Sequence, residues 1–95
     1  MDYEWDEGKR KANLLKHGID FQAVSEFCWD DAEIEQDARQ DYQEKRYTAL
    51  GFIGNRLHLL IFSVRNNTIR IISLRKANKR EGRNYENKTG THFPG

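Results

Sequence analysis

Apolar positions in the first third of the chain recur with the spacing of two short helices. The first covers residues 8–17, since acidic residues precede it, basic residues close it and Gly18 can adopt the left-handed cap. The second covers residues 21 to about 28 and has Asp20 as a good N-cap. Its apolar residues follow a helical stripe: Phe21, Val24, Phe27 and Cys28. The pattern therefore predicts two consecutive helices.

From residue 32 onward the hydrophobic period changes to two. Alternation over 32–38 predicts an edge strand with an acidic outer face. Further apolar segments predict strands over 47–53, 57–64 and 68–74. Gly54-Asn55 and Asn66-Asn67 favour tight turns between them, because glycine and asparagine tolerate positive φ. Strands joined by turns this short form an antiparallel meander.

The last segment with regular spacing is a polar helix from Lys76 to about Lys88, whose only apolar residues are Ala77 and Tyr85. A helix this polar is bridging, partner-bound or marginal. The order of elements predicts an α+β fold, in which two N-terminal helices pack on one face of an antiparallel four-stranded sheet and a C-terminal helix follows. The 95 residues form a single domain, 1–95, with a frayed tail over 89–95.

The net charge of +1 conceals a strong asymmetry along the chain. Residues 1–44 hold 13 acidic against 5 basic residues, a net charge of −8, whereas residues 45–95 hold 2 against 11, a net charge of +9. Such asymmetry indicates that the basic half contacts nucleic acid or another polyanion. The alternative is that the opposite charges interleave once the chain folds.

Several classes of function are excluded by what the sequence lacks. Cys28 is the only cysteine, so no internal disulfide forms and we expect a cytoplasmic protein. No apolar run approaches the roughly 18 residues that span a bilayer, and the acidic start is unlike a signal peptide. The histidines lie far apart and outside any metal-binding motif: His17, His58 and His92. We therefore expect no metal, no other cofactor and no membrane association.

The densest group of positive charges spans the last predicted strand and the C-terminal helix. Arg70 and Arg75 lie on an isoleucine-rich strand, which places them on rigid sheet. Strict alternation points them to opposite faces, so they share a site only if the strand twists or bulges. One basic stripe follows: Lys76, Lys79, Arg80 and Arg83. Because such cations bind phosphodiesters, we predict RNA contacts by Arg46, His58, Lys76, Lys79 and Arg83. Tyr47 and Tyr85 are available to stack on bases, with core packing as their alternative role.

RNA cleavage without a metal is compatible with these residues, because RNA supplies its own nucleophile in the 2′-hydroxyl. The protein then provides a base, cations that offset charge on the phosphorane, and an acid for the leaving oxygen. The candidate bases are His17, His58 or a lysine with a lowered pKa. The predicted charge stabilisers are Arg70, Arg75 and Arg80, and the acid is Tyr85 or a second histidine. Because His17 ends a helix, the dipole favours its charged form.

Several blocks of sequence occur together and in a distinctive order. They are Glu4-Trp5-Asp6, Asn13 to Phe21 with Ala23, Arg46 with Gly51, Arg70 to Ala77, and Glu81 with Tyr85. In this combination the chain resembles the BrnT family, small ribonuclease toxins of type II toxin-antitoxin systems. The resemblance implies a RelE-like fold, metal-independent endoribonuclease activity that halts translation, and a cognate BrnA antitoxin that covers the toxin in a mixed assembly.

Two hypotheses from different classes therefore stand. In the first, the chain is an RNA-cleaving toxin whose basic half meets RNA. In the second, it is a non-catalytic basic module that binds an acidic protein partner or nucleic acid. The sequence assigns neither the general base nor the general acid.

Overall fold

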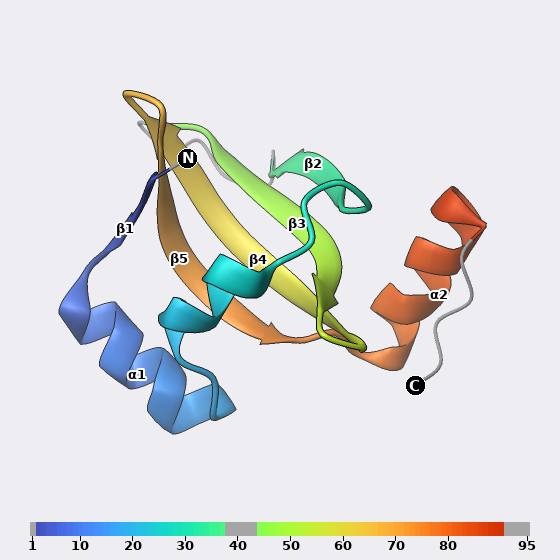
Figure 1. Cartoon of the computed structure of the whole chain (residues 1–95), viewed down its shortest axis with the longest axis horizontal. Helices are drawn as coiled ribbons and strands as arrows, with labels where there is room; N and C mark the ends of the chain where they lie inside the picture. The colour runs from blue at the N-terminus through green and yellow to red at the C-terminus, as the bar shows by residue number, and fades with distance from the viewer. Residues whose placement is uncertain (1, 38–43, 91–95) are drawn as a thin grey trace.

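The computed structural model describes residues 2–37 and 44–90, and within these ranges five strands form one mixed sheet (Figure 1). In chain order the elements are β1 (Asp2–Trp5), α1 (Glu7–His17), the 3₁₀ helix η1 (Phe21–Glu26), β2 (Glu33–Asp37), β3 (Arg46–Ile53), β4 (Arg56–Arg65), β5 (Thr68–Lys76) and α2 (Lys79–Thr89). The strand order across the sheet is β1-β5-β4-β3-β2. No helix within these ranges has the length and apolar character needed to cross a membrane.

The predicted antiparallel meander is present. β2, β3, β4 and β5 pair as consecutive antiparallel neighbours. β2 covers 33–37 of the predicted 32–38, and residue 38 lies outside the described residues. Gly54, Asn66 and Asn67 have φ values of 63°, 53° and 64°, the left-handed conformation that these tight turns require. Local turn chemistry was therefore sufficient to predict this part of the sheet.

The prediction of an antiparallel four-stranded sheet is wrong, because the N-terminus adds a fifth strand. β1 lies parallel to β5, with Tyr3 beside Ile69 and Trp5 beside Ile71. The rings of Tyr3 and Trp5 pack against the core, which stabilises a strand of only four residues. This pairing joins residues 3 and 69, 66 positions apart, so no local pattern could reveal it.

The first predicted helix is confirmed, whereas the second is a shorter 3₁₀ helix. α1 begins after Asp6, whose carboxylate accepts a backbone N–H, and ends at Gly18 with φ 73°. η1 ends at Glu26 instead of continuing to residue 28. The chain leaves the helix there because Phe27 forms a backbone bridge with Ile53 at the end of β3.

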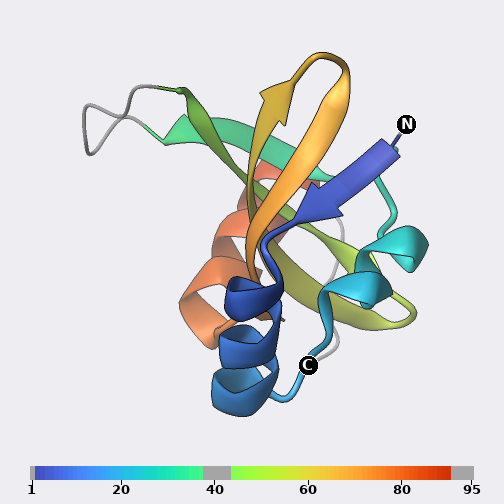
Figure 2. The same cartoon turned by 90° about the vertical axis from the view of Figure 1, so that its left-hand side faces the viewer.

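Two hydrophobic clusters lie on opposite faces of the sheet. η1 packs on one face, where the buried residues are Phe21, Val24, Phe27, Ala49, Leu60, Phe62, Ile69, Ile71 and Leu74. Gly51 is required beneath η1, because a Cβ there would lie 2.5 Å from the ring of Phe27. On the other face, α2 is joined to the sheet through Leu57, Ala77 and Tyr85. The helices therefore cover both faces of the sheet (Figure 2). The sequence predicted helices on one face only.

α2 begins three residues later than predicted. Lys76 is still part of β5, where it pairs with His58. Asn78 then caps the helix in a capping box with Glu81. The predicted frayed tail, 89–95, starts too early, since Thr89 belongs to α2 and Gly90 forms its left-handed cap with φ 72°. Residues 91–95 lie outside the described residues.

Candidate functional site

A bulge in β5 brings Arg70 and Arg75 to the same face of the sheet. Ile61 pairs with Ser73, whereas the next residue of β4, Phe62, pairs with Ile71, so β5 carries one extra residue between these pairs. Directly paired strand residues point to the same side. On β4, every second residue points to the same side: Leu59, Ile61 and Ser63. Their partners on β5 are Arg75, Ser73 and Arg70, so these three β5 side chains share one face. The sequence required a twist or a bulge for Arg70 and Arg75 to share a site, and the bulge provides it.

Asn13 of α1 holds the bulged part of β5 in place. Its buried side-chain amide donates to the carbonyl of Leu74 (2.7 Å) and accepts the Leu74 N–H (3.2 Å) and the Ser73 hydroxyl (3.4 Å). A second donated bond reaches the carbonyl of Ile19 (3.1 Å). β1 ends opposite Ile71, so beyond it the amide takes the place of a neighbouring strand. Sequence reasoning gave Asn13 no role in the site, although it begins one of the distinctive sequence blocks and lies on the inner side of a short helix.

Arg75 forms a bidentate ion pair with Glu81 at the start of α2. The two guanidinium nitrogens lie 2.9 and 2.8 Å from the two carboxylate oxygens. Glu81 also accepts the backbone N–H of Asn78 (2.9 Å). Partial burial opposes ionisation of Glu81, but the hydrogen bonds from Arg75 and Asn78 outweigh it and lower the Glu81 pKa. Arg75 is thus held rigidly by the element that follows it.

His17 lies at the end of α1, close enough to Arg75 for that charge to affect its titration. Partial burial, and then the positive charges of Lys16 and Arg75, lower the His17 pKa below its ordinary value. These effects oppose the helix dipole, which by itself favours charged His17, and the pKa is lowered overall. The lowered pKa favours the neutral imidazole, which can accept a proton.

Arginines from adjacent strands surround Ser63 on the same face of the sheet. Ser63 pairs with Arg46 of β3 on one side and with Arg70 of β5 on the other. Arg70 lies 3.7 Å from the carboxylate of Glu4. Glu44 accepts hydrogen bonds from Arg65 (2.7 Å) and Ser63 (3.2 Å), and the bond from Arg65 is the main cause of its lowered pKa. The arginines at this end of the face are therefore interspersed with carboxylates.

Three residues that the sequence offered for the site either lie on the other face of the sheet or have their polar group bonded within the protein. His58 is buried on the opposite side, where its Nδ1 lies 2.9 Å from the carbonyl of Arg56, and burial lowers its pKa. Tyr85 is buried, its pKa raised mainly by burial, and its hydroxyl donates to the carbonyl of Asp31 (2.7 Å). Tyr47 stacks on Phe62, also on the opposite side. These placements favour packing roles for the two tyrosines.

The remaining predicted cations are exposed but not all on one element. Lys79, Arg80 and Arg83 are exposed on α2. Lys76 is exposed at the end of β5, so the predicted four-residue helical stripe begins outside the helix. Among the described residues, no group of three histidine, cysteine, aspartate or glutamate side chains is arranged to hold a metal ion.

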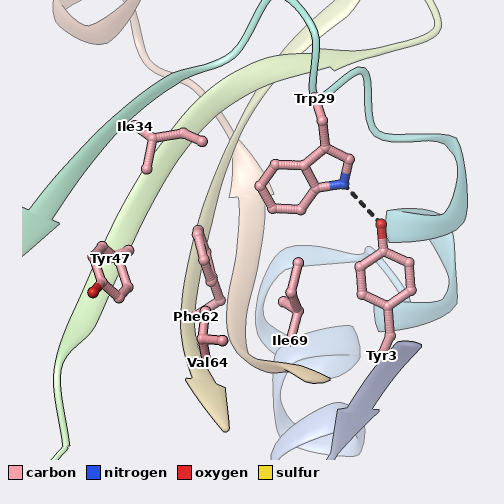
Figure 3. A pocket seen from close by; sticks show the side chains of 7 residues that line it. All are labelled: Tyr3, Trp29, Ile34, Tyr47, Phe62, Val64 and Ile69. Carbon is pink, nitrogen blue, oxygen red and sulfur yellow. Dashed lines mark hydrogen bonds between the residues drawn. The ribbon is translucent and has the colours of Figure 1, made fainter. Parts of the chain in front are cut away.

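Two grooves of the molecule have linings that are apolar or mostly acidic. One, of about 550 Å³, crosses the face covered by η1 and has no charged side chain in its lining: Tyr3, Trp29, Ile34, Tyr47, Phe62, Val64 and Ile69 (Figure 3). The indole of Trp29 donates to the hydroxyl of Tyr3 (2.7 Å) at its end. The other, of about 390 Å³, lies between α2 and β2, and most of its charged lining residues are acidic: Glu33, Glu35, Asp37 and Glu81, with Arg75 and Lys88.

The family of the chain follows from a comparison with protein-family models. The model described as "Ribonuclease toxin, BrnT, of type II toxin-antitoxin system" matches residues 5–81. The chain belongs to the BrnT family. It is thus a ribonuclease toxin of a type II system, a type that has a cognate antitoxin as its partner. No curated protein matches the chain.

The BrnT match covers the bulged strand and the residues that hold it, but not the end of α2. Asn13, His17 and Glu81 lie within the matched residues, as do Arg70 and Arg75. Arg83 and Tyr85 lie beyond them.

Proposed function

We propose that this BrnT-family chain cleaves RNA internally and without a metal, by attack of the RNA's own 2′-hydroxyl, and thereby inhibits translation in the cytoplasm. The observation that carries the proposal is the bulge in β5. It gives Arg70, Ser73 and Arg75 a common face, and His17 lies near Arg75 with a lowered pKa. A neutral base beside fixed guanidinium groups is the arrangement that this reaction requires.

In the proposed reaction, neutral His17 accepts the proton of the 2′-hydroxyl as the 2′-oxygen attacks phosphorus. Arg70 and Arg75 offset the negative charge that develops on the phosphorane oxygens. The bond from phosphorus to the 5′-oxygen then breaks, and that oxygen takes up a proton from water. The products are a 2′,3′-cyclic phosphate and a 5′-hydroxyl end. We assign no acid role to Tyr85, because its hydroxyl proton is bonded to a backbone carbonyl.

Further cations hold the rest of the RNA in this proposal. Arg80 lies next to Glu81, and Lys79 and Arg83 are exposed on the same helix. Arg46 lies on the same face as Arg70. Their role is to bind phosphates, which lowers the dissociation constant for RNA without changing the chemical step.

The test is cleavage of single-stranded RNA by the purified chain in excess EDTA. We expect cyclic phosphate ends, no cleavage where the attacking nucleotide carries 2′-deoxyribose, and a loss of about 10²–10⁴-fold in kcat for His17→Gln. The His17→Gln protein must melt near the wild-type temperature for the comparison to hold.

Cleavage that stops in EDTA would contradict metal independence. RNA that is bound by the folded protein but remains intact would favour the non-catalytic binding module instead.

A further inference from the structure

A third groove, of about 290 Å³, runs between α1 and the bulged part of β5. Its lining residues are Lys9, Ala12, Asn13, Lys16, His17, Ile72 and Ser73. The α1 residues recur at intervals of three and four, which places all of them on one side of the helix. This groove therefore ends at His17 and Ser73, at the proposed reaction site.

The charged side chains that line this groove are cationic. Lys9 and Lys16 are exposed, and within residues 2–37 and 44–90 neither forms an ion pair. The neighbouring carboxylates have other partners, since Glu7 and Asp20 both pair with Arg10. Lys16 is close enough to His17 to contribute to its lowered pKa. The groove thus carries uncompensated positive charge within the half of the sequence that is acidic overall.

We propose that this groove binds the phosphodiester backbone of single-stranded RNA, with Lys9 and Lys16 contacting different phosphates and directing the strand to His17. Lys9 and Lys16 are seven residues apart, a rise of about 10 Å along α1, which allows their ammonium groups to contact different phosphates. The inference rests on the proposed function, since it identifies where the substrate of that reaction lies. It adds α1 to a binding surface that the sequence placed in the basic half alone.

The test compares single lysine substitutions on the same helix. Lys9→Gln and Lys16→Gln each remove one charge from the groove, whereas Lys11→Gln removes one from the side of α1 that faces away from it. The probe is a mixed-sequence, fully 2′-O-methylated RNA, which cannot be cleaved. Its affinity is measured by fluorescence anisotropy over a series of salt concentrations.

Lys9→Gln and Lys16→Gln should each weaken binding about 3- to 10-fold and reduce the slope of log affinity against log salt by about 0.7, the value for one phosphate contact to a single strand. Lys11→Gln should leave the slope unchanged. Lys9→Arg and Lys16→Arg keep the positive charge, so they should retain the wild-type affinity and slope.

Equal losses for all three glutamine variants would overturn the inference, since they would indicate only a general charge effect. It would also fail if Lys9→Gln and Lys16→Gln bound RNA normally but lost affinity for the antitoxin, because the groove would then be a protein-binding site. Failure of the proposed function has a different signature: wild-type protein would bind the probe yet leave ordinary RNA intact.

Discussion

At the residue scale, the geometry of the site depends on a side chain whose partners are distant in sequence. Asn13 bonds to both backbone groups of Leu74, 61 positions away. The polar groups of a buried strand edge must be paired, and here one amide pairs two of them. Helical periodicity predicted α1 correctly but could not show which of its polar residues is buried, because that depends on where β5 lies.

Protonation of His58 should destabilise the folded chain. Burial lowers its folded-state pKa below 6.5, so the unfolded chain binds more protons as the pH falls. The folded chain therefore has its full stability above the pKa of about 6.5 that His58 has in the unfolded chain. That stability declines as the pH falls through this value toward the lower pKa of His58 in the folded chain. In urea titrations, the free energy of unfolding should fall between about pH 7.5 and 5.5, and less steeply for His58→Gln.

The His17 pKa is shifted in the same direction, so His17→Gln is the matched control. An unaltered pH dependence in His58→Gln, with a flattened one in His17→Gln, would assign the effect to His17 instead.

At the scale of elements, α2 is a polar helix that is stable because its first turn and its buried side are both anchored. Asn78 and Glu81 satisfy each other's backbone N–H groups in the capping box. Tyr85 is the large apolar residue that the helix buries, and it packs edge to face on Phe52 with ring centres 5.6 Å apart. The sequence predicted the helix and its polarity, but the anchor to Arg75 required the register of β5.

The ion pair between Arg75 and Glu81 should couple the sheet to α2. We expect Arg75→Gln and Glu81→Gln each to lower the free energy of unfolding, and the double variant to lose about 1–2 kcal/mol less than the sum of the two. Urea unfolding of the four proteins measures this coupling. Strictly additive losses would show that the two side chains, though 2.8 Å apart, do not depend on each other.

The strands that the sequence predicted best are those whose neighbours are adjacent along the chain. Alternation and turn residues were sufficient for β2 to β5, whereas β1 depends on a distant parallel partner. The bulge does leave a trace, since Ile71 and Ile72 are consecutive apolar residues where alternation requires one to be polar. Two adjacent isoleucines are also compatible with a strand buried on both faces, so this signal alone does not decide the register.

At the scale of the whole molecule, the opposite charges of the two halves partly interleave. Among the residues that the structure describes, ion pairs that join the halves include Glu4 with Arg70, Glu35 with Lys88, and Glu44 with Arg65. The exposed cations that we propose to bind RNA include Lys9 and Lys16 on α1 and Lys79, Arg80 and Arg83 on α2. The interpretation that the opposite charges interleave therefore holds in part, whereas RNA contact by the basic half stays a prediction.

Binding of the antitoxin, which we propose to be BrnA-like, should stabilise this small domain. A partner that binds only the folded state adds about 2.7 kcal/mol at a concentration 100 times its Kd, which corresponds to roughly 10 °C or more in Tm for a domain of this size. Differential scanning fluorimetry of the free chain and of the co-purified complex measures the shift. A complex that melts at the temperature of the free chain would argue against tight binding to the folded state.

The pairing of β1 with β5 also bears on when the proposed reaction site can form during synthesis. β1 and Asn13 both need partners from residues 68–76, which the ribosome adds in the last third of the chain. Until that segment emerges, α1 has no strand to pack on, and His17 and Arg75 cannot approach each other. Contacts this distant in sequence also form slowly. The proposed reaction site at His17 and Arg75 is therefore absent until residues 68–76 have been made.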